Sequence, residues 1–302
     1  MPRRYFFGLL ALASLWTFSN PVRADQLIPP AFTVKMNAIP DQAQTDPSAN
    51  FPHGGVHLCG PCAVSNSMVW LSDHGYRKLV PEGNGGKTSQ IDLVRLLGSD
   101  RYVGTTMEKG SSPEQIMLGV SRFLKDRGYD YERMQYQGWR QHSAQFSTGV
   151  TTPDLNWIKA GMLGNSAVWL NLGWYLYDEA KREYRRTGGH WVTMVGYGVD
   201  EHGTANDSVL IVHDPFPRNG MAPSNDYLHL ERINDDAMIQ SREAPPGGIS
   251  AKGQYRLTRG IAMKTGARAL LDGAIILHMA APDRVEPPTT ISAEPATRRS
   301  AS

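Results

Sequence analysis

Apolar side chains recur at helical spacing along the first half of the chain. Between residues 61 and 74, Val64, Met68 and Leu71 repeat at intervals of three and four positions, which predicts a helix with one apolar face. Pro61 suits a first helical position, and Gly75 follows the predicted end of the helix. The same spacing predicts three more helices, over residues 88–98, 112–123 and 152–163. The second of these opens with Ser-Pro-Glu-Gln, which is typical of a capping box.

The second half of the chain is dominated by β-prone apolar runs. These runs predict strands over residues 166–177, 190–199, 208–213, 254–257 and 274–279. A turn signal, Glu-His-Gly at residues 201–203, separates the second run from the third and favours a hairpin. Helices followed by antiparallel strands predict an α+β fold.

The two ends of the chain do not fit this pattern. Residues 25–52 are rich in Pro, Asn, Asp and Gln without a sustained period, and we expect them to form an extended arm. Residues 282–302 are rich in Pro, Thr, Ser and Ala and are expected to be disordered. One domain over residues 53–281 is therefore expected between the arm and the tail.

Residues 1–24 have the features of an export signal. Arg3 and Arg4 precede an apolar run over residues 5–18, and Val-Arg-Ala supplies small residues at a cleavage site. The run is too short for a stable membrane-spanning helix. The arginine pair also fits a twin-arginine signal, which would imply export after folding. We expect a mature protein in the periplasm or outside the cell, with no membrane anchor.

Composition narrows the class of protein further. The 302 residues carry 31 Lys and Arg against 29 Asp and Glu, and removal of residues 1–24 takes away three arginines, leaving 28 − 29 = −1. A chain so close to neutrality lacks the basic surface that nucleic-acid binding requires. Its 2 cysteines cannot build a disulfide-rich scaffold or a four-thiolate zinc site. A soluble enzyme or binding protein is the expected class.

The sharpest chemical signal is the segment Leu-Cys-Gly-Pro-Cys-Ala at residues 58–63. It places Cys59 immediately before the predicted helix, where unpaired amides and the positive end of the helix dipole face the sulfur. Such positions lower a cysteine pKa from its usual value of ~8.5 to roughly 3.5–7.5. Cys59 is therefore a candidate nucleophile.

A thiolate nucleophile needs a base, and the base needs a group that orients it. His190 follows two glycines at the start of a predicted strand, and Asp214 ends the next apolar run. If the two strands pair, the imidazole and the carboxylate lie side by side. Cys59 and His190 are 190 − 59 = 131 positions apart, within the roughly 130–150 typical of papain-type enzymes.

These motifs resemble a known family. Cys-Gly-Pro before a helix, Gly-His-Trp-Val at residues 189–192 and Asp-Pro-Phe at residues 214–216 are similar to the double-glycine (bacteriocin-processing) peptidase-like branch of the papain-like cysteine peptidases. The resemblance covers roughly residues 50–216. It implies a papain-like fold, Cys59 as nucleophile, His190 as general base and acid, and Asp214 as orienting group. It also implies a peptide or protein substrate and requires no metal or organic cofactor.

The chain departs from that family in two ways. The family carries a glutamine a few residues before the cysteine as a donor to the oxyanion, and none stands there in this chain. His53, His57 and Asn50 are the candidate replacements, beside the amide of Cys59. The namesake peptidases are also fused to export transporters inside cells, so cleavage after a Gly-Gly leader is not implied.

Other readings of the same residues stay open. Cys59 and Cys62 form a Cys-Gly-Pro-Cys motif, as in thioredoxin-like dithiol oxidoreductases, and the pair could also join as a disulfide. A catalytically inactive papain-like binding domain is a further alternative. An amidase or an acyltransferase would use the same thiol chemistry. The histidines show no metal-ligand spacing, so no metal site is predicted.

Overall fold

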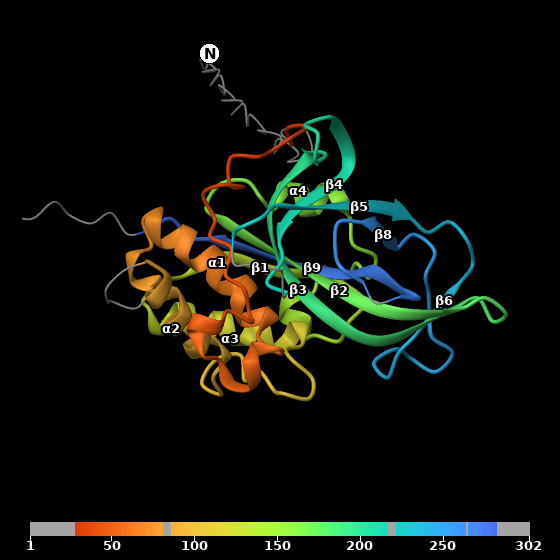
Figure 1. The fold of residues 1–302 in the computed structure, drawn as a ribbon, viewed down its shortest axis with the longest axis horizontal. Helices are drawn as coiled ribbons and strands as arrows, with labels where there is room; N and C mark the ends of the chain where they lie inside the picture. Colours follow the sequence, from red (N-terminus) through yellow and green to blue (C-terminus); the bar gives the residue numbers. More distant parts are fainter. Residues whose placement is uncertain (1–27, 81–85, 217–221, 264, 283–302) are drawn as a thin grey trace, which may run out of the picture.

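The computed structural model describes residues 28–80, 86–216, 222–263 and 265–282 (Figure 1). The predicted export signal and nearly all of the predicted disordered tail lie outside these residues. In the part of the chain that is described, no helix is long and apolar enough to cross a membrane.

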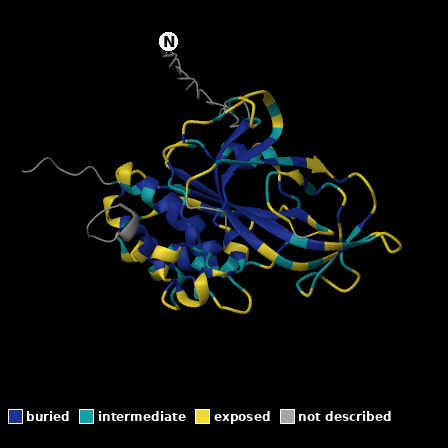
Figure 2. Cartoon of the chain, viewed as in Figure 1, coloured by how far each residue is buried: buried dark blue, intermediate teal, exposed yellow. Residues whose placement is uncertain are grey.

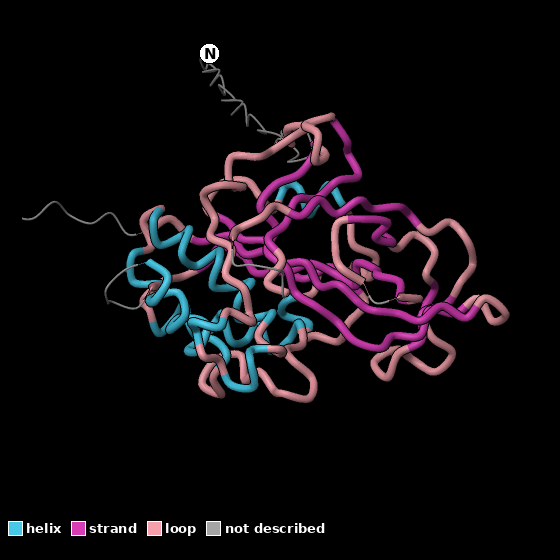
Figure 3. Tube along the Cα trace, viewed as in Figure 1, coloured by secondary structure: helices cyan, strands magenta, loops and turns pink. Residues whose placement is uncertain are grey.

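The fold is α+β, with helices in the N-terminal half packed on an antiparallel barrel in the C-terminal half (Figures 1 and 3). The α-helices are α1 (Cys59–Asp73), α2 (Gly86–Gly98), α3 (Pro113–Asp126) and α4 (Leu155–Ala160). The described residues also form the short 3-10 helices η2 (Pro47–Ala49), η3 (Pro52–Gly55), η4 (Arg77–Leu79) and η5 (Ala144–Phe146). The expected capping box at the start of α3 is confirmed, with both reciprocal hydrogen bonds present.

Six strands close into a barrel. They are β2 (Ser166–Asp178), β3 (Glu183–Val199), β4 (Ala205–His213), β5 (Asp226–Arg232), β8 (Tyr255–Arg259) and β9 (Ala267–Met279). Pairing runs from β3 through β4, β5 and β8 to β9, and β2 closes the ring because it pairs with both β3 and β9. The strands β1 (Tyr131–Gly138), β6 (Met238–Gln240) and β7 (Ile249–Ser250) extend the sheet outside the ring. Only the β3–β6 pairing is parallel among the described strand pairs.

Two strand predictions need correction. β1 lies in the half of the chain predicted to be helical, because only its second half is buried and its polar first half hides the alternation. β3 begins at Glu183, seven residues before His190, so His190 is not at the start of its strand. The first residues of β3 are largely exposed and polar, and they belong to a hairpin with β2. An apolar pattern therefore could not reveal them.

Helix α1 is the central helix and is buried on almost all sides (Figure 2). It packs on β3 and α2. The contact with β3 is polar as well as apolar: the Thr193 hydroxyl donates to the carbonyl of Ala63 at 2.8 Å and accepts from the Asn66 amide at 3.2 Å. All three groups are buried, so these hydrogen bonds fix the start of α1 against the barrel.

Residues 28–52 form no long helix or strand, yet they pack closely against the rest of the chain. Phe32 bridges to Tyr197 of β3 through two backbone hydrogen bonds. The Lys35 ammonium is buried, where it donates to the Gly164 and Ser166 carbonyls at 3.0 Å each. Burial lowers the pKa of Lys35 to about 7. The described part of the predicted arm is thus an integral layer of the molecule.

Candidate active site

The candidate nucleophile stands at the first residue of α1. Cys59 is buried with 8% of its surface exposed, and its thiol is free. The regular first turn is shown by the Cys62 amide, which donates to the Leu58 carbonyl at 2.9 Å. The unpaired amides of a helix start and the positive end of the helix dipole therefore lie at this sulfur, as the sequence predicts.

The loop before Cys59 takes a sharply turned path. Asn50, His53, Gly54 and Gly55 all have left-handed backbone, with φ values of 45°, 51°, 68° and 76°. At Gly55 the turn leaves no room for a side chain, because an added Cβ would lie 1.7 Å from the carbonyl oxygen of Gln44. The segment of residues 28–52 therefore packs directly against the loop before Cys59, through the contact between Gln44 and Gly55.

His190 and Asp214 are brought together by the barrel. Strands β3 and β4 pair in antiparallel fashion with Thr193 opposite His213, as the predicted hairpin requires. His190 Nε2 lies 2.5 Å from Asp214 Oδ1, and both residues are buried. The same carboxylate oxygen accepts the backbone N–H of Phe216 at 2.8 Å, which fixes its orientation.

The environment of His190 favours its charged form. Burial by itself lowers the pKa of the imidazole, but the charge and hydrogen bond of Asp214 and, after them, the hydrogen bond and charge of Cys59 raise it to about 10. The charge of Cys59 thus acts on the His190 imidazole. Since Nε2 is engaged with Asp214, Nδ1 is the nitrogen that remains for a second partner.

The three predicted oxyanion donors, Asn50, His53 and His57, lie nearer the surface than the buried residues Cys59, His190 and Asp214. Asn50 and His53 are exposed, and His57 is half-buried. Among the described residues we find no side-chain hydrogen bond from any of them to the Cys59–His190–Asp214 group. Asn50 instead ends the short helix η2, where its left-handed backbone turns the chain.

Gln44 is a polar group that the sequence interpretation missed. It is 2% exposed, and its side-chain amide donates to the Gly55 carbonyl at 3.2 Å. Its backbone N–H donates to the Pro215 carbonyl at 2.8 Å, so Gln44 joins the nucleophile loop to the segment that carries Asp214. The side-chain oxygen is buried without a hydrogen-bond partner. Gln44 precedes Cys59 by 15 positions, so it lies outside the few residues before the cysteine in which the sequence predicts a donor.

Gly189, the second of the two glycines before His190, makes room for a buried ion pair. Arg186 Nε lies 2.8 Å from the fully buried Asp272 carboxylate, and an added Cβ on Gly189 would lie 2.2 Å from Arg186 Nη2. At Gly188 the nearest atom to such a Cβ is a Trp174 ring carbon at 3.3 Å. The need for glycine is therefore strict only at position 189.

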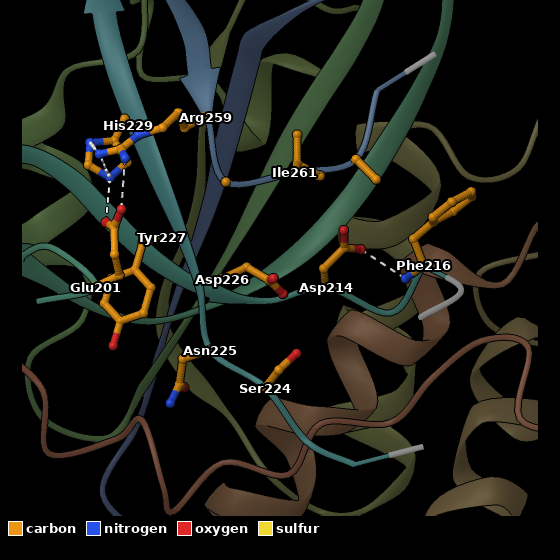
Figure 4. A pocket seen from close by; sticks show the side chains of 12 residues that line it. Glu201, Asp214, Phe216, Ser224, Asn225, Asp226, Tyr227, His229, Arg259 and Ile261 are labelled. Atoms are coloured by element: carbon orange, nitrogen blue, oxygen red, sulfur yellow. Dashed lines mark hydrogen bonds and ion pairs between the residues drawn. The ribbon is translucent and has the colours of Figure 1, made fainter. Parts of the chain in front are cut away.

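Aromatic rings flank the imidazole. Trp174 stacks on His190 with ring centroids 6.0 Å apart, and Phe216 meets its edge at 5.9 Å. Beyond Asp214 lies an open pocket of about 470 Å³ (Figure 4). Its far side is polar: Glu201 accepts from His229 and Arg259 at 2.8 and 2.9 Å. Asp214 and Phe216 thus line this pocket, whereas His190 and Cys59 do not.

Within the described residues, no group of three or more His, Cys, Asp or Glu side chains could hold a metal ion. Comparison with known proteins adds no assignment, because neither a family model nor a curated protein matches the sequence. The site is therefore interpreted from its own geometry.

Proposed function

We propose that the protein is a papain-like cysteine hydrolase that cleaves amide bonds in peptide or protein substrates. The observation that carries the proposal is the buried His190–Asp214 pair, whose imidazole is influenced by the charge of the Cys59 thiol at the start of α1. A thiol, a base and an orienting acid in hydrogen-bonding contact are the minimum set for nucleophilic catalysis by cysteine.

The proposed reaction depends on the protonation state of His190. With the pKa of His190 raised to about 10, the imidazole is protonated at neutral pH and supplies the positive charge that a thiolate nucleophile needs as its partner. The thiolate attacks the substrate carbonyl carbon, and His190 then donates its Nδ1 proton to the leaving amine. A water molecule that gives its proton back to His190 cleaves the thioester, which releases the acid and restores the thiolate.

The oxyanion of the tetrahedral intermediate needs donors close to the sulfur. The backbone amide of Cys59 is one, at the open end of α1. We assign the second to Gln44 rather than to His53, His57 or Asn50, because Gln44 is buried against the nucleophile loop and retains a second side-chain N–H. Removing one such donor costs roughly 10²–10³ in rate.

Two alternatives use parts of the same site. A dithiol oxidoreductase would use Cys59 and Cys62 but leaves the buried His190–Asp214 pair without a role. An amidase or acyltransferase would share every step up to the acyl-enzyme and differ only in the substrate or the acceptor.

The proposal is tested by labelling and hydrolysis on the reduced full chain. Cys59 should react with iodoacetamide well below pH 8, and His190→Ala should reduce that reactivity at pH 6 by at least about tenfold. Hydrolysis of a mixed fluorogenic peptide library should be abolished by Cys59→Ser. Retained hydrolysis in that variant, or a labelling profile unchanged by His190→Ala, would overturn the proposal.

Cys62→Ser separates hydrolysis from dithiol exchange. A hydrolase keeps its peptide cleavage in this variant, whereas a dithiol oxidoreductase loses its exchange activity. Equal loss of peptide cleavage in Cys62→Ser and Cys59→Ser, with both variants folded by circular dichroism, would count against the hydrolase.

A further inference from the structure

The proposed reaction leaves one chemically capable group unused. Cys62 is a free thiol, fully buried one helical turn after Cys59. It packs in a small apolar cluster that includes Ile91 and Val94 of α2. The chain has only 2 cysteines, so any disulfide within one molecule must join these two.

The start of α1 sets the distance between the two cysteines. Its first turn is regular, since the Cys62 amide donates to the carbonyl four residues earlier. Residues three apart in a regular α-helix have Cα atoms about 5 Å apart, from its rise and radius. That separation lies inside the roughly 4.4–6.8 Å range of disulfide-bonded Cα atoms. The Cβ atoms of such a pair lie about 5–6 Å apart, against roughly 3.5–4.5 Å in a disulfide, so the first turn of α1 must tighten slightly as the sulfurs join.

The charge of Cys59 acts on the buried Cys62 thiol. Burial is the main cause that raises the pKa of Cys62 well above its ordinary value, and the charge of Cys59 adds to it. Cys59 retains 8% of its surface exposed, whereas Cys62 has no exposed surface. An external reagent therefore meets Cys59 first.

We propose that Cys62 is a resolving thiol that joins Cys59 in a reversible disulfide when a low-molecular-weight disulfide such as oxidised glutathione reacts with the site. The Cys59 thiolate attacks one sulfur of the oxidant, forming a mixed disulfide and expelling one thiolate. Cys62 then loses its proton and attacks the Cys59 sulfur, which expels the second thiolate. In sum, two protein thiols are oxidised to one disulfide, and one external disulfide is reduced to two thiols.

The disulfide would remove the nucleophile without altering the rest of the site. Only this consequence, the loss of hydrolysis, rests on the proposed function. Formation of the bond depends on the cysteine pair alone. A thiol reductant that attacks Cys59 would restore both thiols.

The test uses the full chain incubated with oxidised glutathione, followed by intact mass and labelling of free thiols after denaturation. The wild-type chain should end two hydrogens lighter, with no adduct and no free thiol. Cys62→Ala should instead keep one glutathione per chain. Cys62→Ser, which retains a side chain of similar size, should behave like Cys62→Ala, and circular dichroism checks that each variant is folded. Iodoacetamide labelling of oxidised wild type should fall by at least about tenfold and recover with dithiothreitol.

A stable glutathione adduct on wild type, or a Cys62 thiol that remains free after oxidation, would overturn the inference. These readouts need no substrate, so they separate the two proposals. A disulfide in a chain whose reduced form hydrolyses nothing would leave the inference standing and the hydrolase rejected. Hydrolysis without any disulfide would give the opposite result.

Discussion

His190 and Asp214 are placed by strand pairing, whereas Cys59 is placed by an irregular loop and the buried arm beneath it. On the barrel side, the antiparallel register of β3 and β4 fixes which residues are neighbours over many hydrogen bonds. On the nucleophile side, position depends on left-handed turns and on close backbone contact between Gln44 and Gly55. The candidate site thus depends on many strand-pairing hydrogen bonds at the His190–Asp214 end and on a few specific residues at the Cys59 end.

The largest expected effect is at the loop. Gly55→Ala combines a left-handed backbone, which costs about 1–2 kcal/mol for a residue with a Cβ, with overpacking against a main-chain oxygen, which costs about 1–3 kcal/mol more. Gly54→Ala is the matched control, because its φ is similarly positive but nothing lies within 4 Å of an added Cβ. Urea unfolding should show Gly55→Ala to be the less stable by about 2 kcal/mol. Equal stabilities would mean that the loop can relax.

The next largest effect is expected at the hydrogen bonds that join α1 to β3 through Thr193. Thr193→Val removes the hydroxyl that serves both the Ala63 carbonyl and the Asn66 amide, leaving two buried polar groups with one partner fewer. Such losses cost about 1–3 kcal/mol. Thr193→Ser keeps the hydroxyl and loses one methyl, for about 0.8 kcal/mol. If the two variants unfold at the same urea concentration, the hydroxyl does not hold α1 to β3.

The pH dependence of stability tests the barrel side alone. Because the pKa of His190 is raised to about 10 in the folded chain, its contribution to stability is fully present below about pH 6.5 and is lost as the pH rises toward 10. Asp214→Asn removes the main group that raises it. The variant should therefore lose less stability than wild type between pH 6.5 and 10, by at least about 1.4 kcal/mol.

The control for this pH experiment is an exposed ion pair. Asp236→Asn removes a carboxylate that pairs with Lys252 at the surface, and its pH dependence should match wild type. Parallel pH profiles for wild type and Asp214→Asn would contradict a charged His190 in the folded protein.

The difference between strand pairing on the barrel side and long-range contacts at the loop also explains which features the sequence could predict. Periodicity and turn signals predicted the helical half, the hairpin of β3 and β4 and the proximity of His190 to Asp214, because pairing of adjacent strands follows local pattern. The capping box at the start of α3 was predicted for the same reason. These features depend on residues close together in the sequence.

The features that were missed depend on contacts between distant residues. Closure of the barrel requires β2 to pair with β9, roughly a hundred residues away, and no local pattern encodes that pairing. Gln44 lies in a segment without a period, so its burial against Gly55 could not be read from spacing. The residue that we assign to the oxyanion therefore emerged only from the fold.

The smallest expected effect separates two explanations of the glycines before His190. One explanation is that both glycines leave space for a substrate. In the fold, Gly189 also leaves space for the guanidinium of Arg186, which pairs with buried Asp272. Gly189→Ala should cost about 1 kcal/mol, because the end of a flexible side chain can shift only partly when it is held by a buried carboxylate. Gly188→Ala should change stability by less than about 0.5 kcal/mol. If Gly189→Ala leaves stability unchanged but slows peptide hydrolysis, Gly189 makes room for the substrate rather than for the ion pair. The His190 side of the site would then depend on a single residue, as the loop before Cys59 does.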